Sequence, residues 1–162
     1  MARVFKLGDN VSTDEILPGR YAYTLYDRTE MARHALEDLD PSFARRLRPG
    51  DVVVAGRNFG CGAAREEAAA CLKEAGIAAV LAVSFARLFW RNALTVGLPP
   101  LVCPAAAAVL VEGDELSLDL GRGLLVTERG QFSAEPLAEP LRELLAAGGA
   151  LPLAKKKLAS GR

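Results

Sequence analysis

Three short apolar segments that alternate with two helical patterns constrain the fold of this chain more than any other feature. The segments are DVVVAG at 51–56, AAVLAVS at 78–84 and LPPLVC at 98–103, and each has the length and composition of a buried strand. The helical patterns cover 65–75 and 85–94. Strands that alternate with helices in this order predict an α/β domain.

The spacing of apolar residues indicates which side of each helix is buried. Gly76 is expected to end the first helix. Along the second helix, Arg87 and Arg91 fall together on one outer face, and Trp90 is expected in the core or at an interface. The residues expected to point inward are Ala68, Ala69, Leu72, Phe85, Leu88 and Phe89.

The rest of the chain adds shorter elements. The opening ARVFKL is a strand candidate, and GDNVSTDEILPGRY after it is expected to be a polar, turn-rich loop. ELSLDL and GLLVTE alternate in period two around a Gly-Arg-Gly turn, which predicts a hairpin. We expect one domain over 1–154 and a frayed basic tail over 155–162. Further helical segments are expected at 29–36, 40–47 and 135–151, the last with a stop at Gly148 and Gly149.

Composition and charge exclude several classes of function. Twenty basic and twenty acidic side chains cancel and only 6% of residues are aromatic, so we expect no nucleic acid partner and no anionic membrane partner. No apolar stretch is long enough to span a bilayer, and the N-terminus lacks the apolar run of a signal peptide. The three cysteines contain no CxxC pair, which predicts free thiols, no metal site on this chain and a cytoplasmic location.

The stretch GRNFGCGAARE, residues 56–66, follows the first apolar strand and predicts an anion-binding loop. Backbone amides and a positive helix end favour an anion after a strand–glycine–helix junction. It is not a dinucleotide fingerprint, because Arg65 occupies the third glycine position, and it lacks the GK[ST] ending of a Walker loop. Arg65 is expected in the first helical turn, where a cation opposes the helix dipole unless an anion lies between them. A guanidinium can hold a carboxylate through two parallel hydrogen bonds.

At three places the chain resembles a known family. NFGCGAARE with AVSFARLFWRNALTVGLPPL, the VSTDEILPGRY loop, and the ending EPLAEPLRELLAAGGALP are similar, in this order, to motifs of the small swivelling domain of the aconitase superfamily. The branch that the chain resembles most is the separate small subunit of isopropylmalate isomerase and homoaconitase. The resemblance covers about residues 5–154 and implies a three-layer β/β/α swivelling domain.

The resemblance also implies an activity and a partner. The chain would be a hydro-lyase subunit that closes over a larger subunit, in a heterodimer or a dimer of such pairs. The pair would isomerise a hydroxy acid by dehydration and rehydration, with isopropylmalate as the first choice of substrate and the homoaconitase substrate as the second. The resemblance implies that the larger subunit carries a [4Fe-4S] cluster. The cysteines of this chain are not spaced as cluster ligands.

Several residues match functional positions of that family. Arg65 would bind a substrate carboxylate, with help from the backbone amides that precede it. Thr13 and Asp14 would shape the site, although such residues also cap their own loops. The candidates for substrate binding are Gly62, Ala63, Ala64, Arg65, Thr13 and Asp14, and those for substrate specificity are Arg20, Tyr21, Tyr23 and Thr24.

The chain departs from the family pattern at one position that matters. The usual loop is GSSRE, and its first serine is the base; here Ala63 takes that place, and a methyl group cannot accept a proton. Three explanations remain open. Cys61 could replace the base, because an arginine and a helix N-terminus favour a thiolate. The larger subunit could perform the chemistry, or the chain could bind or regulate without catalysing.

Overall fold

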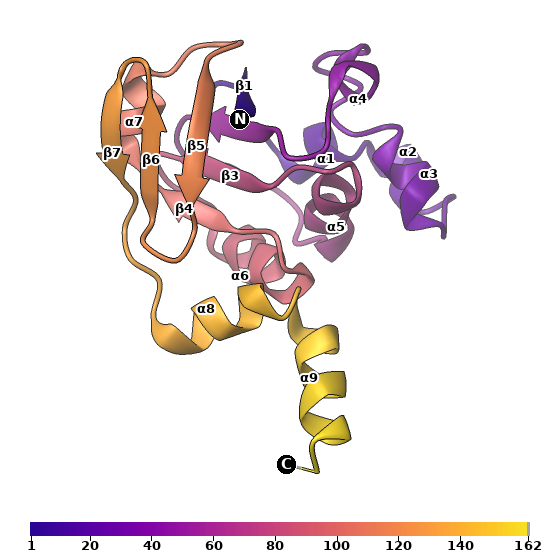
Figure 1. Ribbon diagram of the computed structural model, residues 1–162. Helices are drawn as coiled ribbons and strands as arrows, with labels where there is room; N and C mark the ends of the chain where they lie inside the picture. Colours follow the sequence, from indigo (N-terminus) through magenta and orange to yellow (C-terminus); the bar gives the residue numbers. More distant parts are fainter. Residues whose placement is uncertain (162) are drawn as a thin grey trace.

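The strands form one curled sheet. The computed structural model describes residues 1–161, and in this part of the chain the seven strands have the order β4-β3-β2-β1-β5-β6-β7 (Figure 1). The strands are β1 Ala2–Lys6, β2 Val52–Ala55, β3 Ala79–Ala82, β4 Pro100–Val102, β5 Glu115–Asp119, β6 Leu124–Thr127 and β7 Gly130–Ser133.

The first four strands run parallel. β1 pairs with β2, β2 with β3 and β3 with β4, so that Val54 lies opposite Leu81. β2 and β3 are buried along their whole length, as expected for parallel strands that are covered on both faces. These strands lie on the apolar segments identified in the sequence, which confirms the α/β prediction.

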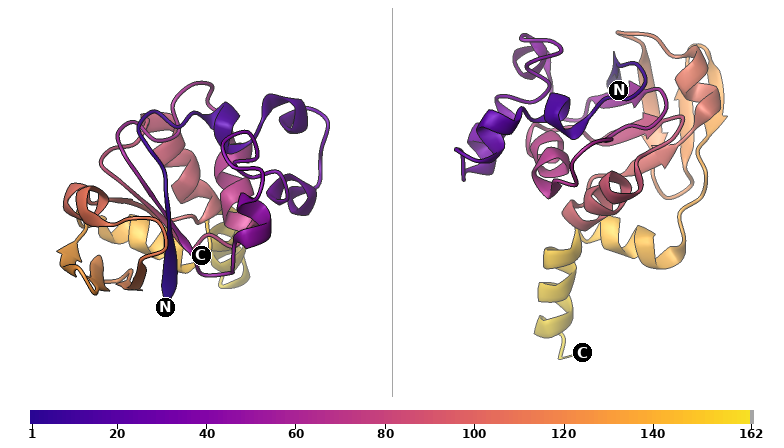
Figure 2. Two further views of the ribbon diagram at one scale, coloured as in Figure 1. Left: turned by 90° about the horizontal axis from the view of Figure 1, so that it is seen from above. Right: turned by 180° about the vertical axis from the view of Figure 1, so that it is seen from behind.

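Helices cover one face of the parallel strands, and a second layer of strands covers the other (Figure 2). Val53 and Ala55 of β2 pack in a core with α5 and α6, whereas Val52 and Val54 pack in a core with β5, β6 and α7. β5, β6 and β7 pair antiparallel, with β5 against β1. These layers confirm the predicted β/β/α arrangement. The helices are α1 Thr13–Ile16, α2 Gly19–Ala22, α3 Arg28–Ala32, α4 Phe43–Arg46, α5 Glu66–Glu74, α6 Arg87–Val96, α7 Pro104–Val109, α8 Glu139–Ala146 and α9 Ala150–Ala159.

Some details of the sequence prediction are wrong. The segment expected to be a turn-rich loop contains the short helices α1 and α2. Leu88 was expected to point inward but is 53% exposed, because Phe89, at 1%, takes the inward position on that turn of α6. Neither α7 nor β7 was anticipated; α7 is a short alanine-rich helix, and Phe132 is the one large apolar residue of β7.

The C-terminal segment also differs from expectation. α8 ends before Gly148 and Gly149, as predicted, but the chain then forms α9 instead of a frayed tail. Lys155, Lys156 and Lys157 belong to this helix, which projects from the body of the molecule (Figures 1 and 2). Leucine and lysine favour helix, so a new helix, α9, begins after the two glycines.

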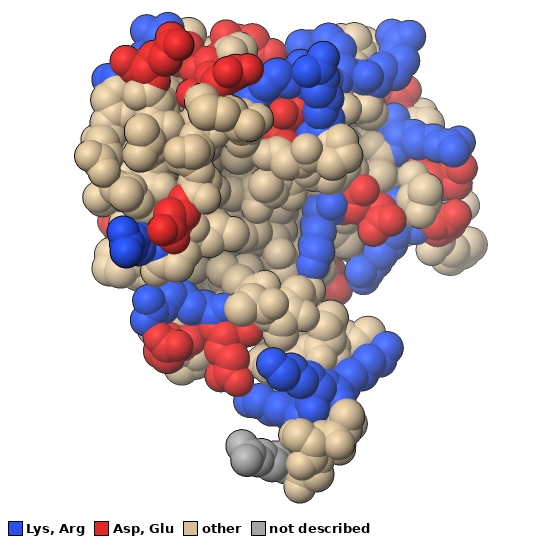
Figure 3. Space-filling view, in the orientation of Figure 1, with Lys and Arg blue, Asp and Glu red and all other residues tan. Residues whose placement is uncertain are grey.

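The surface carries charges of both signs. On the face shown in Figure 3, acidic and basic side chains are interspersed, with an uncharged area over β6 and β7 and a basic group on α9. Within residues 1–161, no helix has the length and apolar character needed to cross a bilayer.

Candidate functional site

The glycine loop, residues 56–65, lies beside the segment 8–14 because each follows one of two neighbouring parallel strands. β1 and β2 are paired, so the chain leaves their carboxyl ends side by side. The amide of Thr13 donates to the carbonyl oxygen of Cys61 at 2.8 Å, and the amide of Gly60 donates to that of Val11 at 2.7 Å. The hydroxyl of Thr13 donates to the carbonyl oxygen of Ala63 at 2.7 Å. These bonds fix the two segments as one unit.

Two glycines give the loop its shape. Gly60 and Gly62 have φ angles of +82° and +88°, in the region that glycine tolerates best. A Cβ atom on Gly60 would lie 2.1 Å from the ring of Phe89, whereas one on Gly62 would lie 3.7 Å from its nearest neighbours. Gly60 therefore allows the close approach of α6, and Gly62 serves the turn alone.

A capping box orients the N-terminus of α1. The Ser12 hydroxyl accepts from the amide of Glu15 at 3.1 Å, and the Glu15 carboxylate accepts from the amide of Ser12 at 2.8 Å. Thr13 and Asp14 are the first residues of this helix. Thr13 is buried and Asp14 is exposed, so the cap turns the hydroxyl into the loop and the carboxylate toward solvent.

Arg65 lies at the centre of the site. It is the N-cap of α5 in extended conformation, so the helix begins at Glu66 and the prediction that Arg65 lies in the first helical turn is wrong by one residue. Its guanidinium lies over the ring of Tyr23, with 5.4 Å from its central carbon to the ring centroid. Nη1 lies 2.7 Å from Oδ1 of Asp14. A Cβ atom on Gly19 would lie 3.4 Å from Nη1, so the backbone of this glycine lies close to the guanidinium.

The guanidinium of Arg65 is held in place, but one of its nitrogens has no hydrogen-bond acceptor. Its Nη1 is buried and has no hydrogen-bond acceptor, because the Asp14 contact meets the distance of an ion pair but not the angle of a hydrogen bond. The side chain of Arg65 is 17% exposed and that of Asp14 is 61% exposed. A buried donor without an acceptor costs about 1–3 kcal/mol, and the charge of Asp14 at 2.7 Å offsets part of that cost.

The backbone around the guanidinium offers further donors. Gly62, Ala63 and Ala64 are exposed, and their amides donate to no acceptor within residues 1–161. Their side chains are hydrogen or methyl, so this stretch presents donors without any proton acceptor on its side chains. The predicted substrate-binding residues are thus brought together at the loop, and the arrangement suits a carboxylate.

The predicted specificity residues divide into two groups. Tyr23 lies under Arg65 and is 73% exposed. Arg20 instead forms a two-pronged contact with Asp38, at 2.8 and 3.2 Å. The Tyr21 ring stacks on His34 with centroids 3.8 Å apart, and the Thr24 hydroxyl donates to the carbonyl oxygen of Arg20. Of the four, Tyr23 is the one in contact with Arg65.

Gly19 is a site residue that the sequence prediction missed. It follows Pro18 in the segment that was expected to be a turn-rich loop, and it lies at the start of α2. A glycine directly after a proline in a loop that carries Asp14 could have indicated a close approach of another group. The arginine that approaches it comes from a distant part of the chain, so local pattern could not identify the contact.

The cysteines do not form a metal or cluster site. The Cys61 thiol donates to the carbonyl oxygen of Asn10 at 3.4 Å, Cys71 contacts that of Met31, and Cys103 contacts that of Ser133. Cys71 and Cys103 are buried, and burial raises the pKa of Cys71 to about 12. Among the described residues no group of three or more His, Cys, Asp or Glu side chains could hold a metal ion. A [4Fe-4S] cluster therefore does not fit the thiols of residues 1–161.

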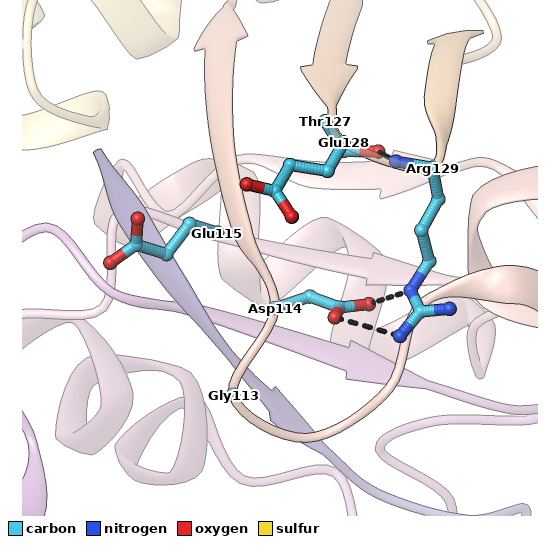
Figure 4. A pocket seen from close by; sticks show the side chains of 6 residues that line it. All are labelled: Gly113, Asp114, Glu115, Thr127, Glu128 and Arg129. Carbon is cyan, nitrogen blue, oxygen red and sulfur yellow. Dashed lines mark hydrogen bonds and ion pairs between the residues drawn. The ribbon is translucent and has the colours of Figure 1, made fainter.

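A hollow of about 510 Å³ lies between the start of β5 and the turn that joins β6 to β7. Figure 4 shows its arginine, Arg129, pointing at Asp114, with nitrogen–oxygen distances of 2.5 and 3.1 Å. The hydrogen bonds from Arg129 hold the pKa of the Asp114 carboxyl below its usual range. Because the guanidinium is already paired with a carboxylate, this hollow is a poorer anion site than the glycine loop.

The chain is similar to several characterised proteins. Residues 9–106 match the family described as the aconitase C-terminal domain. The chain is 47% identical over 153 residues to the 3-isopropylmalate dehydratase small subunit of Moorella thermoacetica, covering 93% of this chain and 92% of that protein. It is 45% identical over 148 residues to the 2,3-dimethylmalate dehydratase small subunit of Eubacterium barkeri, covering 90% of each. A crystal structure of 3-isopropylmalate dehydratase from Methanocaldococcus jannaschii has a TM-score of 0.92 and 40% identity, covering 99% of this chain and 95% of that one.

Proposed function

The chain belongs to the aconitase C-terminal domain family, and from this premise we infer that it is the small subunit of a hydro-lyase of the 3-isopropylmalate dehydratase type. Relatives at 41–47% identity over most of the chain carry that name. They favour it over the homoaconitase alternative. Another relative is named for 2,3-dimethylmalate, so the substrate class we propose is an alkyl-substituted malate.

One observation carries the proposal: the guanidinium of Arg65 is fixed beside free backbone donors. Asp14 and Tyr23 hold the guanidinium, and its Nη1 lacks an acceptor. A carboxylate is an acceptor of the right charge for the partly exposed guanidinium of Arg65 and for the exposed amides of Gly62 and Ala63. We propose that this cradle binds one carboxylate of the substrate and orients the molecule for loss and return of water.

The residues of the loop do not supply a base. Ala63 and Ala64 have no titratable group, and the Thr13 hydroxyl is buried and donates to a carbonyl oxygen. The Cys61 thiol also points at a carbonyl oxygen, which argues against its use as the base. Of the three explanations for the missing serine, we therefore favour substrate binding by this chain and proton transfer by the larger subunit.

The partner follows from the same proposal. The relatives are named as small subunits, which implies a larger one. We propose that the larger subunit carries the [4Fe-4S] cluster, because the three thiols of this chain point to three different carbonyl oxygens and do not converge. The cytoplasmic location, and the dimer of such pairs, stay predictions.

Reconstitution with the larger subunit tests the proposal. The purified pair is assayed with 3-isopropylmalate, 2,3-dimethylmalate and homocitrate, and we expect turnover of an alkyl-substituted malate. Arg65→Ala should abolish turnover with assembly intact, and Cys61→Ala should retain it. Assembly without turnover of any of these acids would contradict the catalytic proposal and leave a regulatory subunit.

A second variant tests whether the loop only binds the substrate or should also supply the catalytic base. Ala63→Ser returns the hydroxyl of the family pattern at an exposed position, so its effect on stability should be small. If proton transfer belongs to the larger subunit, kcat should change less than about threefold, since no essential group was missing. A rise of about a hundredfold or more would show that this chain lacks its base and is a weakened enzyme.

A further inference from the structure

We propose that the surface formed by Arg87, Leu88, Trp90 and Arg91, here called the α6 surface, docks against carboxylates of the larger subunit. This proposal rests on the proposed function, because it takes the larger subunit as the partner. It goes beyond that function by assigning the place of contact and the chemistry of the contacting groups.

The two arginines of the α6 surface lack the acidic partners that most arginines of this chain have. Arg87 and Arg91 are exposed, and neither forms an ion pair within residues 1–161. The arginines with a carboxylate within 4.0 Å are Arg3, Arg20, Arg28, Arg33, Arg46, Arg65, Arg122, Arg129 and Arg142.

The two guanidiniums border a hollow of about 490 Å³. Besides Arg87 and Arg91, it is lined by Val83, Ser84, Phe85, Trp90, Val102 and Glu135. Glu135 is the one acidic residue of this lining, and it forms no ion pair with either arginine. The hollow therefore combines an aromatic and apolar floor with two unpaired cations.

The α6 surface adjoins the glycine loop. The amide of Phe59 donates to the carbonyl oxygen of Ser84 at 3.1 Å, and the amide of Asn58 donates to the Ser84 hydroxyl at 2.8 Å. The loop and the hollow therefore share the carboxyl edge of β2 and β3. A partner that covers Arg65 would therefore lie next to the hollow as well.

The charges of the α6 surface are unfavourable for the helix itself, so acidic groups of a partner would stabilise it. Like charges four residues apart on a helix destabilise it by about 0.2–0.5 kcal/mol, and a cation at the first position opposes the helix dipole. α6 has no acidic residue in its first turn to offset this. Leu88 is 53% exposed on the same turn. Tryptophan and arginine, which lie next to this leucine, are residue types enriched at protein interfaces.

Charge complementarity selects the groups of the partner. Two unpaired guanidiniums beside one hollow can pair with carboxylates of a partner, because a carboxylate accepts two parallel hydrogen bonds from a guanidinium. The larger subunit should therefore place Asp or Glu side chains over Arg87 and Arg91, and apolar atoms over Trp90 and Leu88. Such a contact would depend on ionic strength, since its rim is exposed to solvent.

Charge reversal tests the docking surface. The Arg87→Glu/Arg91→Glu chain is compared with an Arg45→Glu/Arg48→Glu chain, in which two other exposed, unpaired arginines next to the opposite end of β2 undergo the same charge change. Binding to the purified larger subunit is measured by sedimentation at two salt concentrations. We expect about a hundredfold weaker binding for the first variant, with a smaller salt dependence, and unchanged binding for the second.

Trp90 supplies a direct readout because it is the single tryptophan of the chain. The chain labelled with 5-fluorotryptophan should show one fluorine resonance, which shifts when the larger subunit binds. Equal weakening by both variants, or an unmoved resonance on assembly, would overturn the docking proposal. Normal assembly with lost turnover would instead assign Arg87 and Arg91 to the substrate. If the unmodified chain assembles with no larger subunit, it is the proposed function that fails.

Discussion

The Arg65 guanidinium and the Asp14 carboxylate lie 2.7 Å apart, although one follows β2 and the other follows β1. The pair joins the two loops that leave neighbouring parallel strands, and it fixes the cation at the mouth of the glycine loop. The contact matters for function because it orients the guanidinium, which has further N–H donors for a ligand.

Removing the charge of Asp14 should impair substrate binding more than stability. In Asp14→Asn the guanidinium loses its orienting charge, and we expect kcat/KM of the reconstituted enzyme to fall about tenfold. The melting temperature should hold within about 2 °C, because an ion pair with an exposed partner contributes about 0–1 kcal/mol. Asp119→Asn, which removes a charge from the exposed pair with Arg122, is the matched control and should leave kinetics unchanged. Equal kinetic effects of the two variants would contradict the role of Asp14.

The two loop glycines should respond differently to alanine. Gly60→Ala forces a methyl group into the ring of Phe89, so the free energy of unfolding should fall by about 3–5 kcal/mol. Gly62→Ala makes ordinary van der Waals contact at 3.7 Å and carries only the strain of its positive φ, about 1–2 kcal/mol. Denaturant unfolding of both variants measures the difference. Similar losses would show that contact with α6 does not set the requirement at Gly60.

Thiol modification should report on assembly. Cys61 is half-buried in the loop, whereas Cys71 and Cys103 are buried, and burial raises the pKa of Cys71 to about 12. Iodoacetamide should therefore label Cys61 first, and the other two thiols only as the chain unfolds. Peptide mass spectrometry follows each site over time. Binding of the larger subunit should slow labelling at Cys61, and labelling at an unchanged rate would place the loop outside the interface.

Asp51 should make stability depend on pH in the acid range. Its side chain is 4% exposed and accepts hydrogen bonds from Arg3 and from the amide of Arg48. Burial alone would raise the pKa of this carboxyl, but the hydrogen bonds outweigh it, and the pKa lies below 3.8. The stabilisation is present above the unfolded pKa, and it is lost as pH falls through the lower folded pKa.

The Asp51→Asn variant isolates that effect. At pH 7 its free energy of unfolding should be about 3 kcal/mol lower, because a buried charge pair is broken. Below pH 4 the difference from the unmodified chain should shrink as Asp51 is protonated in both the folded and unfolded states. Urea unfolding at several pH values checks this, and a difference that does not change with pH would exclude Asp51 as the titrating group.

Much of the fold could be predicted because its signals are local. The run VVVA of β2 and the run AVLA of β3 need burial on both faces, and Gly76 and Gly97 end the helices that follow them. The glycine loop could be predicted as an anion-binding loop for the same reason, since its glycines and Arg65 are adjacent in sequence, and anion binding there stays a prediction. Leu88 was misplaced because helical spacing left two neighbouring faces equally apolar, and packing against Phe59 selected Phe89.

The sequence by itself determined the strands, the main helices, the glycine loop and the cation beside it, because each depends on residues within a few positions of one another. Only the tertiary structure decided that Asp14, Gly19 and Tyr23 surround Arg65, while Arg20 and Tyr21 turn away to contact Asp38 and His34. Parallel pairing of β1 and β2 brings their carboxyl ends together, and that pairing joins residues that are distant along the chain. The local sequence pattern specifies the segments 8–14 and 56–65 separately, and the strand order brings the two segments together.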